Sequence, residues 1–286
     1  MILFVFSLLN GISWGAVLFL VTSGLSLILG VMGILNLAHG ALYMVGAFVG
    51  WTIVIQYGLN FWLAALIGGL SGGLIGLVIE RVFLRHLYKQ FNEQVLLTFG
   101  FDYILVNLAI WVWGARSRAP FTTPLLSDSV NIMELSYPKA RIAIILIGGI
   151  VAIGLWWLQN KTRLGAIVRA GMDDKEMTMG LGINLPLISM LVFFLGSFLA
   201  GFAGVIGAQV LGASPSLATD ILLLALVVVI IGGVGSVEGA LLGSMLIGVI
   251  DAFGKALFPE IAMFTIYLAM IISLSIRPWG LLGRKL

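Results

Sequence analysis

Long apolar runs alternate along this chain with short connections that carry nearly all of its charge. No Asp, Glu, Lys or Arg precedes Glu80, and between Met177 and Val237 the only residue of these types is Asp220. A soluble fold is not this uniform, because part of each element must face water. A helix of about 20 residues crosses a bilayer. On this basis we expect nine spans, at about 5–30, 38–56, 61–79, 94–113, 140–159, 186–211, 219–232, 238–257 and 261–277.

The length of these runs predicts helices rather than strands. In a bilayer the backbone must satisfy its own hydrogen bonds, in helices or in a closed barrel. Barrel strands alternate between apolar and polar residues over about 10 positions, whereas these runs are longer and apolar on every side. We therefore expect an all-α polytopic membrane protein with about 8–10 transmembrane helices, forming one transmembrane domain over residues 1–286.

Two glycine-rich, uncharged stretches interrupt the apolar pattern, GVMGILNLAHG at 30–40 and GGVGS at 232–236. Each predicts either a tight turn at the cytoplasmic side or a break within the membrane. Polar groups at such a break are costly unless they are buried in protein or line water. Broken or re-entrant segments at corresponding positions of two halves, as in an inverted repeat, are a sign of a substrate route. Ordinary interhelical turns are the alternative interpretation.

The basic residues predict the orientation. With nine spans and the N-terminus outside, the cytoplasmic regions hold ten Lys and Arg residues and the outer regions five. An excess of basic residues in the cytoplasm is the usual bias, so we expect the N-terminus outside and the C-terminus in the cytoplasm. The residues before the first span lack a basic region, which favours a mature first span over a cleavable signal peptide. The longest outer loop, at about 114–138, contains three prolines and predicts irregular or extended structure.

Three acidic residues fall within or beside the spans. Asp102 has no basic neighbour in sequence, and an intramembrane acid is a functional candidate. Asp251 precedes Lys255 by four residues, so the two side chains can pair on one helix face. Glu238 follows Ser236 at an expected helix start, where an acid suits the helix dipole.

Motifs of enzyme chemistry are missing from the sequence. There is no phosphate-binding G-x-x-x-x-G-K-[ST] loop, no H-E-x-x-H and no G-x-S-x-G. The chain has no cysteine, and its two histidines, His39 and His86, fall in different loops. We expect no catalytic residue, metal site or cofactor. The net charge of +3 belongs to basic loops between spans, so we do not expect nucleic-acid binding.

The connection at about 160–185 carries the largest cluster of mixed charge. Segments 166–170 and 175–179 both permit short amphipathic helices. The connection is either a solvated loop or a docking element that inserts into a partner. Gly180 and Gly182 would turn the chain back to the membrane, where Pro186 is tolerated in the first turn of the next helix.

Several of these segments together resemble the permeases of branched-chain amino acid importers of the ATP-binding-cassette class, and more closely their smaller, H-type subunit. The resemblance rests on four motifs that lie at consistent spacing over nearly the whole chain. They are GLSLILGVMGILNLAHGALYMVGA at 24–47, GAIVRA at 165–170 with DKE at 174–176 and GIN at 182–184, IGGVGSVEGALLG at 231–243, and RPWGLLG at 277–283.

This resemblance implies one permease within a five-component complex in a bacterial inner membrane. The other components would be a homologous second permease, two ATPases that bind the ATP and a periplasmic solute-binding protein. The expected substrate route is lined by Asn36, His39, Tyr43, Thr98, Asp102, Gly233 and Ser236. The expected contacts with an ATPase are Arg169, Ala170, Asp174, Glu176, Gly182 and Ile183.

Two departures from the family pattern concern the substrate. Members of the family often have Lys where Leu224 stands, and many have a small or hydroxyl residue where Asp102 stands. If these positions line the route, they disfavour a bare carboxylate. The exact substrate therefore stays open between branched-chain amino acids and a related small polar, amide or organic-acid solute. An alternative function is an ion-coupled secondary transporter that uses Asp102 or Asp251, and a non-transporting membrane anchor is a third class. Transport by the chain alone, under an ion gradient, would distinguish the first alternative.

Overall fold

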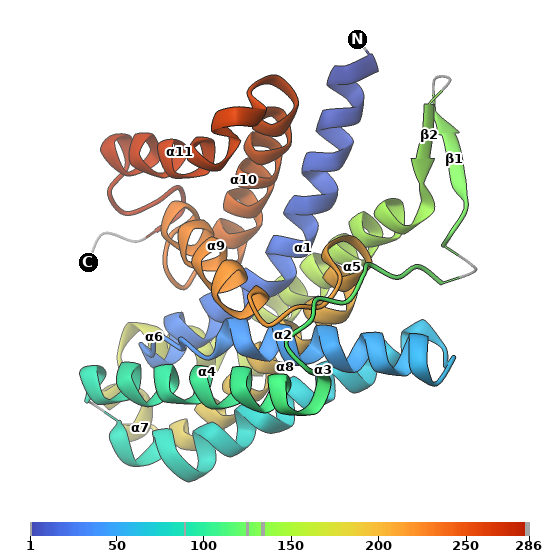
Figure 1. The fold of residues 1–286 in the computed structure, drawn as a ribbon. Helices are drawn as coiled ribbons and strands as arrows, with labels where there is room; N and C mark the ends of the chain where they lie inside the picture. The colour runs from blue at the N-terminus through green and yellow to red at the C-terminus, as the bar shows by residue number, and fades with distance from the viewer. Residues whose placement is uncertain (1, 89, 124–125, 133–134, 284–286) are drawn as a thin grey trace.

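Helices form nearly all of the structure, a computed structural model that describes residues 2–88, 90–123, 126–132 and 135–283 (Figure 1). The helices of the longer apolar spans are α1 (Ile2–Met32), α2 (His39–Trp51), α3 (Phe61–Val78), α4 (Phe91–Trp113), α5 (Lys139–Lys161), α8 (Leu185–Leu211) and α10 (Val237–Leu257). The π-helical turn η1 (Thr52–Gln56) extends α2, and η2 (Ile79–Phe83) with η3 (Leu84–Leu87) extends α3.

The expected all-α polytopic membrane fold is confirmed. In the described part of the chain, seven helices are long and apolar enough to cross a membrane. They correspond to seven of the nine expected spans. The other two expected spans are the shorter apolar helices α9 (Leu217–Gly232) and α11 (Ala262–Ile276), the latter preceded by the 3-10 turn η4 (Pro259–Ile261). At 1.5 Å per residue, the 16 residues of α9 span about 24 Å, less than the roughly 30 Å of a hydrocarbon core.

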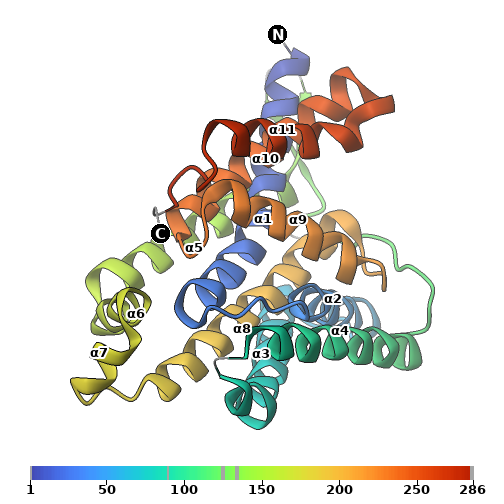
Figure 2. The ribbon, with the colours of Figure 1, turned by 90° about the vertical axis from the view of Figure 1, so that its left-hand side faces the viewer.

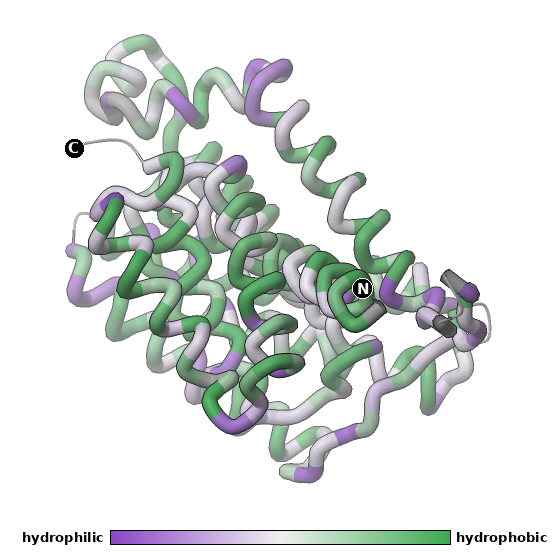
Figure 3. Tube along the Cα trace, turned by 90° about the horizontal axis from the view of Figure 1, so that it is seen from above, coloured by the Kyte–Doolittle hydropathy of each residue, from purple (hydrophilic) through white to green (hydrophobic). Residues whose placement is uncertain are grey.

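Helix α1 lies between two groups of helices. Figures 1 and 2 show α2, α3, α4 and α8 on one side of it and α9, α10 and α11 on the other, with α5 and α6 along its flank. The contacts agree, because α1 packs against α5, α8, α9 and α10, and α8 packs against α2 and α3. Hydrophobic residues run along most helices, and hydrophilic residues gather mainly at helix ends and connections (Figure 3).

Glycines allow these helices to approach backbone to backbone. A Cβ atom on Gly24 of α1 would lie 2.4 Å from the carbonyl oxygen of Gly196 on α8, and one on Gly46 of α2 would lie 2.0 Å from that of Gly201. Small residues serve this role in membrane bundles, where lipid competes equally well for apolar surface and close packing drives association. These glycines therefore mark contacts between helices.

The connections follow the expected pattern. The connection between α4 and α5 contains the antiparallel hairpin of β1 (Ser129–Ile132) and β2 (Leu135–Pro138), in which Val130 pairs with Tyr137. The connection after α5 forms two short helices, α6 (Arg163–Asp173) and α7 (Lys175–Gly180), as the sequence predicts. Both glycine-rich stretches are breaks between helices, with α1 ending before Gly33 and α9 ending before Gly233.

Candidate functional site

The first break is held in place by the chain's own polar groups. Gly33 has a φ of 69°, which an L side chain rarely adopts. The amide oxygen of Asn36 accepts a hydrogen bond from the backbone N–H of Ala38 at 3.2 Å. From α4, the hydroxyl of Thr98 accepts from the N–H of Leu37 at 3.2 Å and lies 3.3 Å from the carbonyl oxygen of Leu35. Asn36 and Thr98, both expected on the route, are thus brought together.

Polar side chains on α2 face the interior of the bundle. His39 and Tyr43 are fully buried, and Nε2 of His39 lies 2.9 Å from the carbonyl oxygen of Val21 on α1. Gly207 of α8 faces the hydroxyl of Tyr43, since a Cβ there would lie 2.0 Å from it. The atoms Nδ2 of Asn36, Nδ1 of His39 and Oη of Tyr43 are buried without a hydrogen-bond partner. His39 and Tyr43 are thus enclosed between α1, α2 and α8.

Asp102 lies apart from that enclosed face. It follows Thr98 by about one turn on α4 and is half-buried. One of its carboxylate oxygens, Oδ1, is enclosed without a hydrogen-bond partner. Leaving a buried carboxylate oxygen unpaired is costly, so Asp102 keeps the candidate status that the sequence gives it.

The second break meets the end of α1. Gly233 and Gly235 have positive φ angles of 103° and 79°. Ser236 caps α10, because its hydroxyl accepts from the N–H of Gly239 at 2.9 Å. The hydroxyl of Ser26 on α1 donates to the carbonyl oxygen of Ser236 at 3.2 Å, and a Cβ on Gly30 would lie 2.6 Å from Cα of Gly235. The two breaks are therefore neighbours, joined through the last turns of α1.

A segment near the C-terminus completes the second break. Leu281 and Leu282 donate their N–H groups to the carbonyl oxygens of Ile231 and Gly232, at 2.7 and 3.0 Å. The last carbonyls of a helix lack partners within the helix, so this segment satisfies the end of α9. The sequence RPWGLLG indicates only a family motif and gives no sign of this contact.

The connection between α5 and α8 is built from capped short helices. Thr162 caps α6 and Asp174 caps α7, each accepting a backbone N–H bond, at 3.1 and 2.9 Å. Gly182 turns the chain with a φ of 81°, and Pro186 lies in the first turn of α8, as expected. The guanidinium of Arg169 donates to the carbonyl of Gln159, at the end of α5.

The remaining residues expected to contact an ATPase differ in exposure. Ala170, Asp174 and Gly182 are exposed and Ile183 is half-buried. The side chain of Glu176 lies outside the part of the chain that the structure describes.

One residue of α6 contacts both breaks at once. The terminal methyl of Met172 would lie 3.1 Å from a Cβ on Gly30 and 3.0 Å from one on Gly235. The sequence pattern around Met172 does not predict this contact. The charged connection after α5 is therefore in direct contact with the junction of the two breaks.

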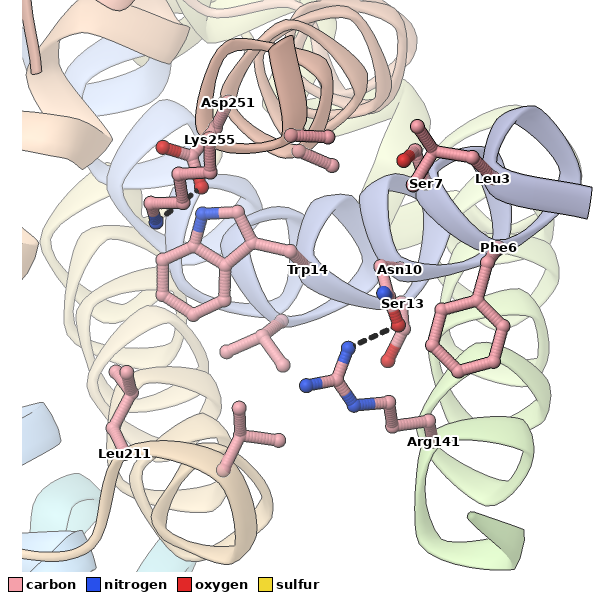
Figure 4. A pocket seen from close by; sticks show the side chains of 14 residues that line it. Leu3, Phe6, Ser7, Asn10, Ser13, Trp14, Arg141, Leu211, Asp251 and Lys255 are labelled. Carbon is pink, nitrogen blue, oxygen red and sulfur yellow. Dashed lines mark hydrogen bonds and ion pairs between the residues drawn. The ribbon is translucent and has the colours of Figure 1, made fainter. Parts of the chain in front are cut away.

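A cavity of about 390 Å³ lies near the other end of α1 (Figure 4). The first turns of α1, the start of α5 and the ends of α8 and α10 surround it. Lys255 donates to Asp251 at 2.7 Å, which confirms the pairing expected on one helix face. Arg141 points into the cavity from α5 and donates to the amide oxygen of Asn10. Among the described residues, no group of His, Cys, Asp and Glu could hold a metal ion.

Comparisons with known proteins identify the family. Residues 7–274 match the family described as "Branched-chain amino acid transport system / permease component". The chain is 31% identical to the high-affinity branched-chain amino acid transport system permease protein BraD of Pseudomonas aeruginosa, over 97% of this chain and 95% of the relative. It is 26% identical to LivH of Escherichia coli over 98% and 96% of the two chains, and 27% identical to LivM of the same organism over 91% and 66%.

A solved structure shares the fold. PsaBC from Streptococcus pneumoniae, in complex with Fab, superposes with a TM-score of 0.54 over 93% of this chain and 89% of that chain, at 12% identity. The family match covers most of the chain, and the relative from Pseudomonas aeruginosa is similar over nearly its whole length. This chain belongs to the family of branched-chain amino acid transport system permease components.

Proposed function

We propose that this chain forms part of a pore that imports amino acids with branched aliphatic side chains, or a related small amide or organic acid, driven by ATP hydrolysis in separate subunits. The names of the relatives support the substrate class. Two permease proteins of one Escherichia coli transport system, LivH and LivM, are both similar to this chain. This similarity supports a homologous second permease as the neighbour. Two ATPases and a periplasmic binding protein complete the proposed complex.

The proposed orientation has the N-terminus in the periplasm and the C-terminus in the cytoplasm of a bacterial inner membrane. It is supported by the excess of Lys and Arg in the regions that it assigns to the cytoplasm. With this orientation α6 and α7 lie on the cytoplasmic side, where an ATPase can reach them. We assign them the role of docking elements, with Arg169, Ala170, Asp174, Glu176, Gly182 and Ile183 at or beside the contact.

The contact of Met172 with Gly30 and Gly235 carries the coupling part of this proposal. Motion passes between distant sites only through packed groups that have two arrangements. A docked helix that moves α6 would move the methyl of Met172 against both breaks. The proposed route then opens beside these breaks, where Asn36, His39, Tyr43, Thr98, Asp102, Gly233 and Ser236 gain access to the solute. The unpaired atoms of Asn36, His39 and Tyr43 would find partners in that other state.

A variant of Met172 tests the coupling. We expect Met172→Ala to leave the complex assembled and ATP hydrolysis stimulated by the loaded binding protein, while the solute imported per ATP falls by about two- to thirtyfold, the range of a coupling residue. The measurement is uptake and hydrolysis by the same proteoliposomes. Met270→Ala in α11 is the matched control and should change neither.

Two docking variants complete this test. Glu176→Lys and Gly182→Val should instead lower the stimulated hydrolysis itself, because both change the docking connection. Normal uptake and hydrolysis in all three variants would contradict the coupling role. Uptake by the chain alone under an ion gradient, without ATPases, would show a secondary transporter that uses Asp102 or Asp251.

A further inference from the structure

The cavity in Figure 4 has the size and the lining of a small-molecule site. Its volume of about 390 Å³ falls within the range of about 300–1,000 Å³ that is usual for ligand pockets. Phe6, Trp14 and Leu211 supply apolar walls, and Ser7 and Asn10 on α1 supply polar groups. Polar residues converge here from helices that are otherwise apolar, as in a site that selects its ligand.

Arg141 is the group in this cavity with hydrogen-bonding capacity to spare. A guanidinium has five N–H donors and keeps its charge, yet among the described residues it interacts only with the amide of Asn10 and the hydroxyl of Tyr137 and forms no ion pair with a carboxylate. Burial raises the pKa of Tyr137 above its ordinary value, so this hydroxyl offers the guanidinium no negative charge. A cation among apolar walls is stabilised by an anion that binds its planar fork with two oxygens.

Among the described residues that line the cavity, the one acidic side chain already has a partner. Asp251 is buried and accepts from Lys255, whose side chain is mostly exposed. Figure 4 shows this pair and Arg141 on either side of the Trp14 indole. The lining therefore carries one more positive than negative charge. It offers a strong site for a carboxylate and a weaker one, at Asp251, for an ammonium group.

We propose that this cavity binds a small solute that carries a carboxylate and a short apolar side chain, with the carboxylate on Arg141 and the side chain against Trp14 and Leu211. The proposal rests on the proposed transport function, which it deepens by placing a solute site within this subunit. In the proposed orientation the start of α1, the start of α5 and the end of α10 all face the periplasm, so the site would receive solute before the breaks open.

Direct binding tests this site without ATP. The assembled transporter is placed in phosphatidylcholine nanodiscs, without the binding protein, and equilibrium binding of radiolabelled L-leucine is measured. We expect 4-methylpentanoate, which keeps the carboxylate, to compete, and leucinamide, which lacks it, to fail. Arg141→Gln should weaken binding by about tenfold or more, as expected for loss of a charged hydrogen bond. Lys139→Gln, two residues away and paired with Asp128, should bind as the unchanged protein does.

A second variant keeps the test decisive if Arg141→Gln does not assemble. Ala252 lines the cavity from α10, so Ala252→Leu should fill it and abolish binding while the unfolding temperature stays unchanged. The proposal is wrong if leucinamide competes as well as leucine, if the variants bind normally, or if the unchanged complex binds none of the probes. It is also wrong if phosphatidylglycerol, rather than leucine, stabilises the complex in a manner that depends on Arg141.

This assay separates the two proposals. Binding that depends on Arg141, in a complex that shows no ATP-driven uptake, would retain the site and remove the proposed function. Normal ATP-driven uptake with no binding in the cavity would do the reverse.

Discussion

Helices α1 and α4 are almost equally apolar, yet they occupy opposite environments. The most apolar stretch of α1 has a mean hydropathy of 2.2, and 89% of its residues are buried. That of α4 has a mean hydropathy of 1.9, and 17% of its residues are buried. In a soluble protein the exposed helix would have a much lower hydropathy than the buried one. In a bilayer it does not need to, because lipid solvates an apolar face as well as protein does. The difference lies in the glycines. Gly24 of α1 touches another backbone, and around Gly100 of α4 there is open space.

The largest expected difference comes from substituting leucine for glycine at these two positions. Gly24→Leu should prevent folding, with a cost of at least about 3 kcal/mol, because the new side chain would overlap the backbone of Gly196 and force α1 and α8 apart. Gly100→Leu should fold normally and gain up to about 1 kcal/mol in helix propensity. The measurement is the monodisperse fraction in detergent by size-exclusion chromatography. Equal yields for both variants would show that the close packing of α1 is not required.

A smaller effect is expected from removing side chains on the same two helices. Leu20 of α1 is fully buried and Leu96 of α4 is 71% exposed. Leu20→Ala should lower the free energy of unfolding by about 2–5 kcal/mol through the cavity it leaves. Leu96→Ala should change it by under about 1 kcal/mol, because lipid or detergent fills the space. The midpoint of thermal unfolding in one detergent checks both, and a large loss for Leu96→Ala would place protein against α4.

The smallest expected effect concerns the ion pair of Asp128 and Lys139, which is exposed to water rather than to lipid. The hydrogen bond and positive charge of Lys139 lower the pKa of Asp128 below its ordinary value. The contribution of this pair to stability is therefore complete above the ordinary pKa of about 3.9 and is lost as the pH falls through the lowered pKa. Asp128→Asn should remove only this small pH dependence, and high salt should hide it, because exposed pairs are screened. Unfolding midpoints between pH 3 and 7 measure it.

Lys255→Ala provides the contrast to that exposed pair. It leaves Asp251, whose side chain is only 9% exposed, without its partner, and should cost roughly 1–3 kcal/mol. A loss at Asp128→Asn as large as that at Lys255→Ala would mean that burial does not distinguish the two pairs.

Local features of the sequence predicted much of the fold. The nine apolar segments, both glycine-rich breaks, the helix start at Ser236 and the pairing of Asp251 with Lys255 all follow from patterns within about twenty residues. The route residues remain a prediction, although the structure does join Asn36 to the Thr98 region. Contacts between distant segments could not be predicted, because apolar side chains give no sign of which neighbour they touch. Met172 looks like any methionine in an amphipathic helix, and only the folded chain places it against Gly30 and Gly235.

The bonds from Leu281 and Leu282 to the end of α9 also have a consequence for biogenesis. A ribosome makes α9 well before it makes these two residues. Until they arrive, the carbonyl oxygens of Ile231 and Gly232 have no backbone donor from this segment, and an unpaired carbonyl in a bilayer costs several kcal/mol. The second break therefore reaches its final form only late in synthesis. We expect a shortened polypeptide that stops before residue 281 to insert its spans but to leave the end of α9 without these two bonds.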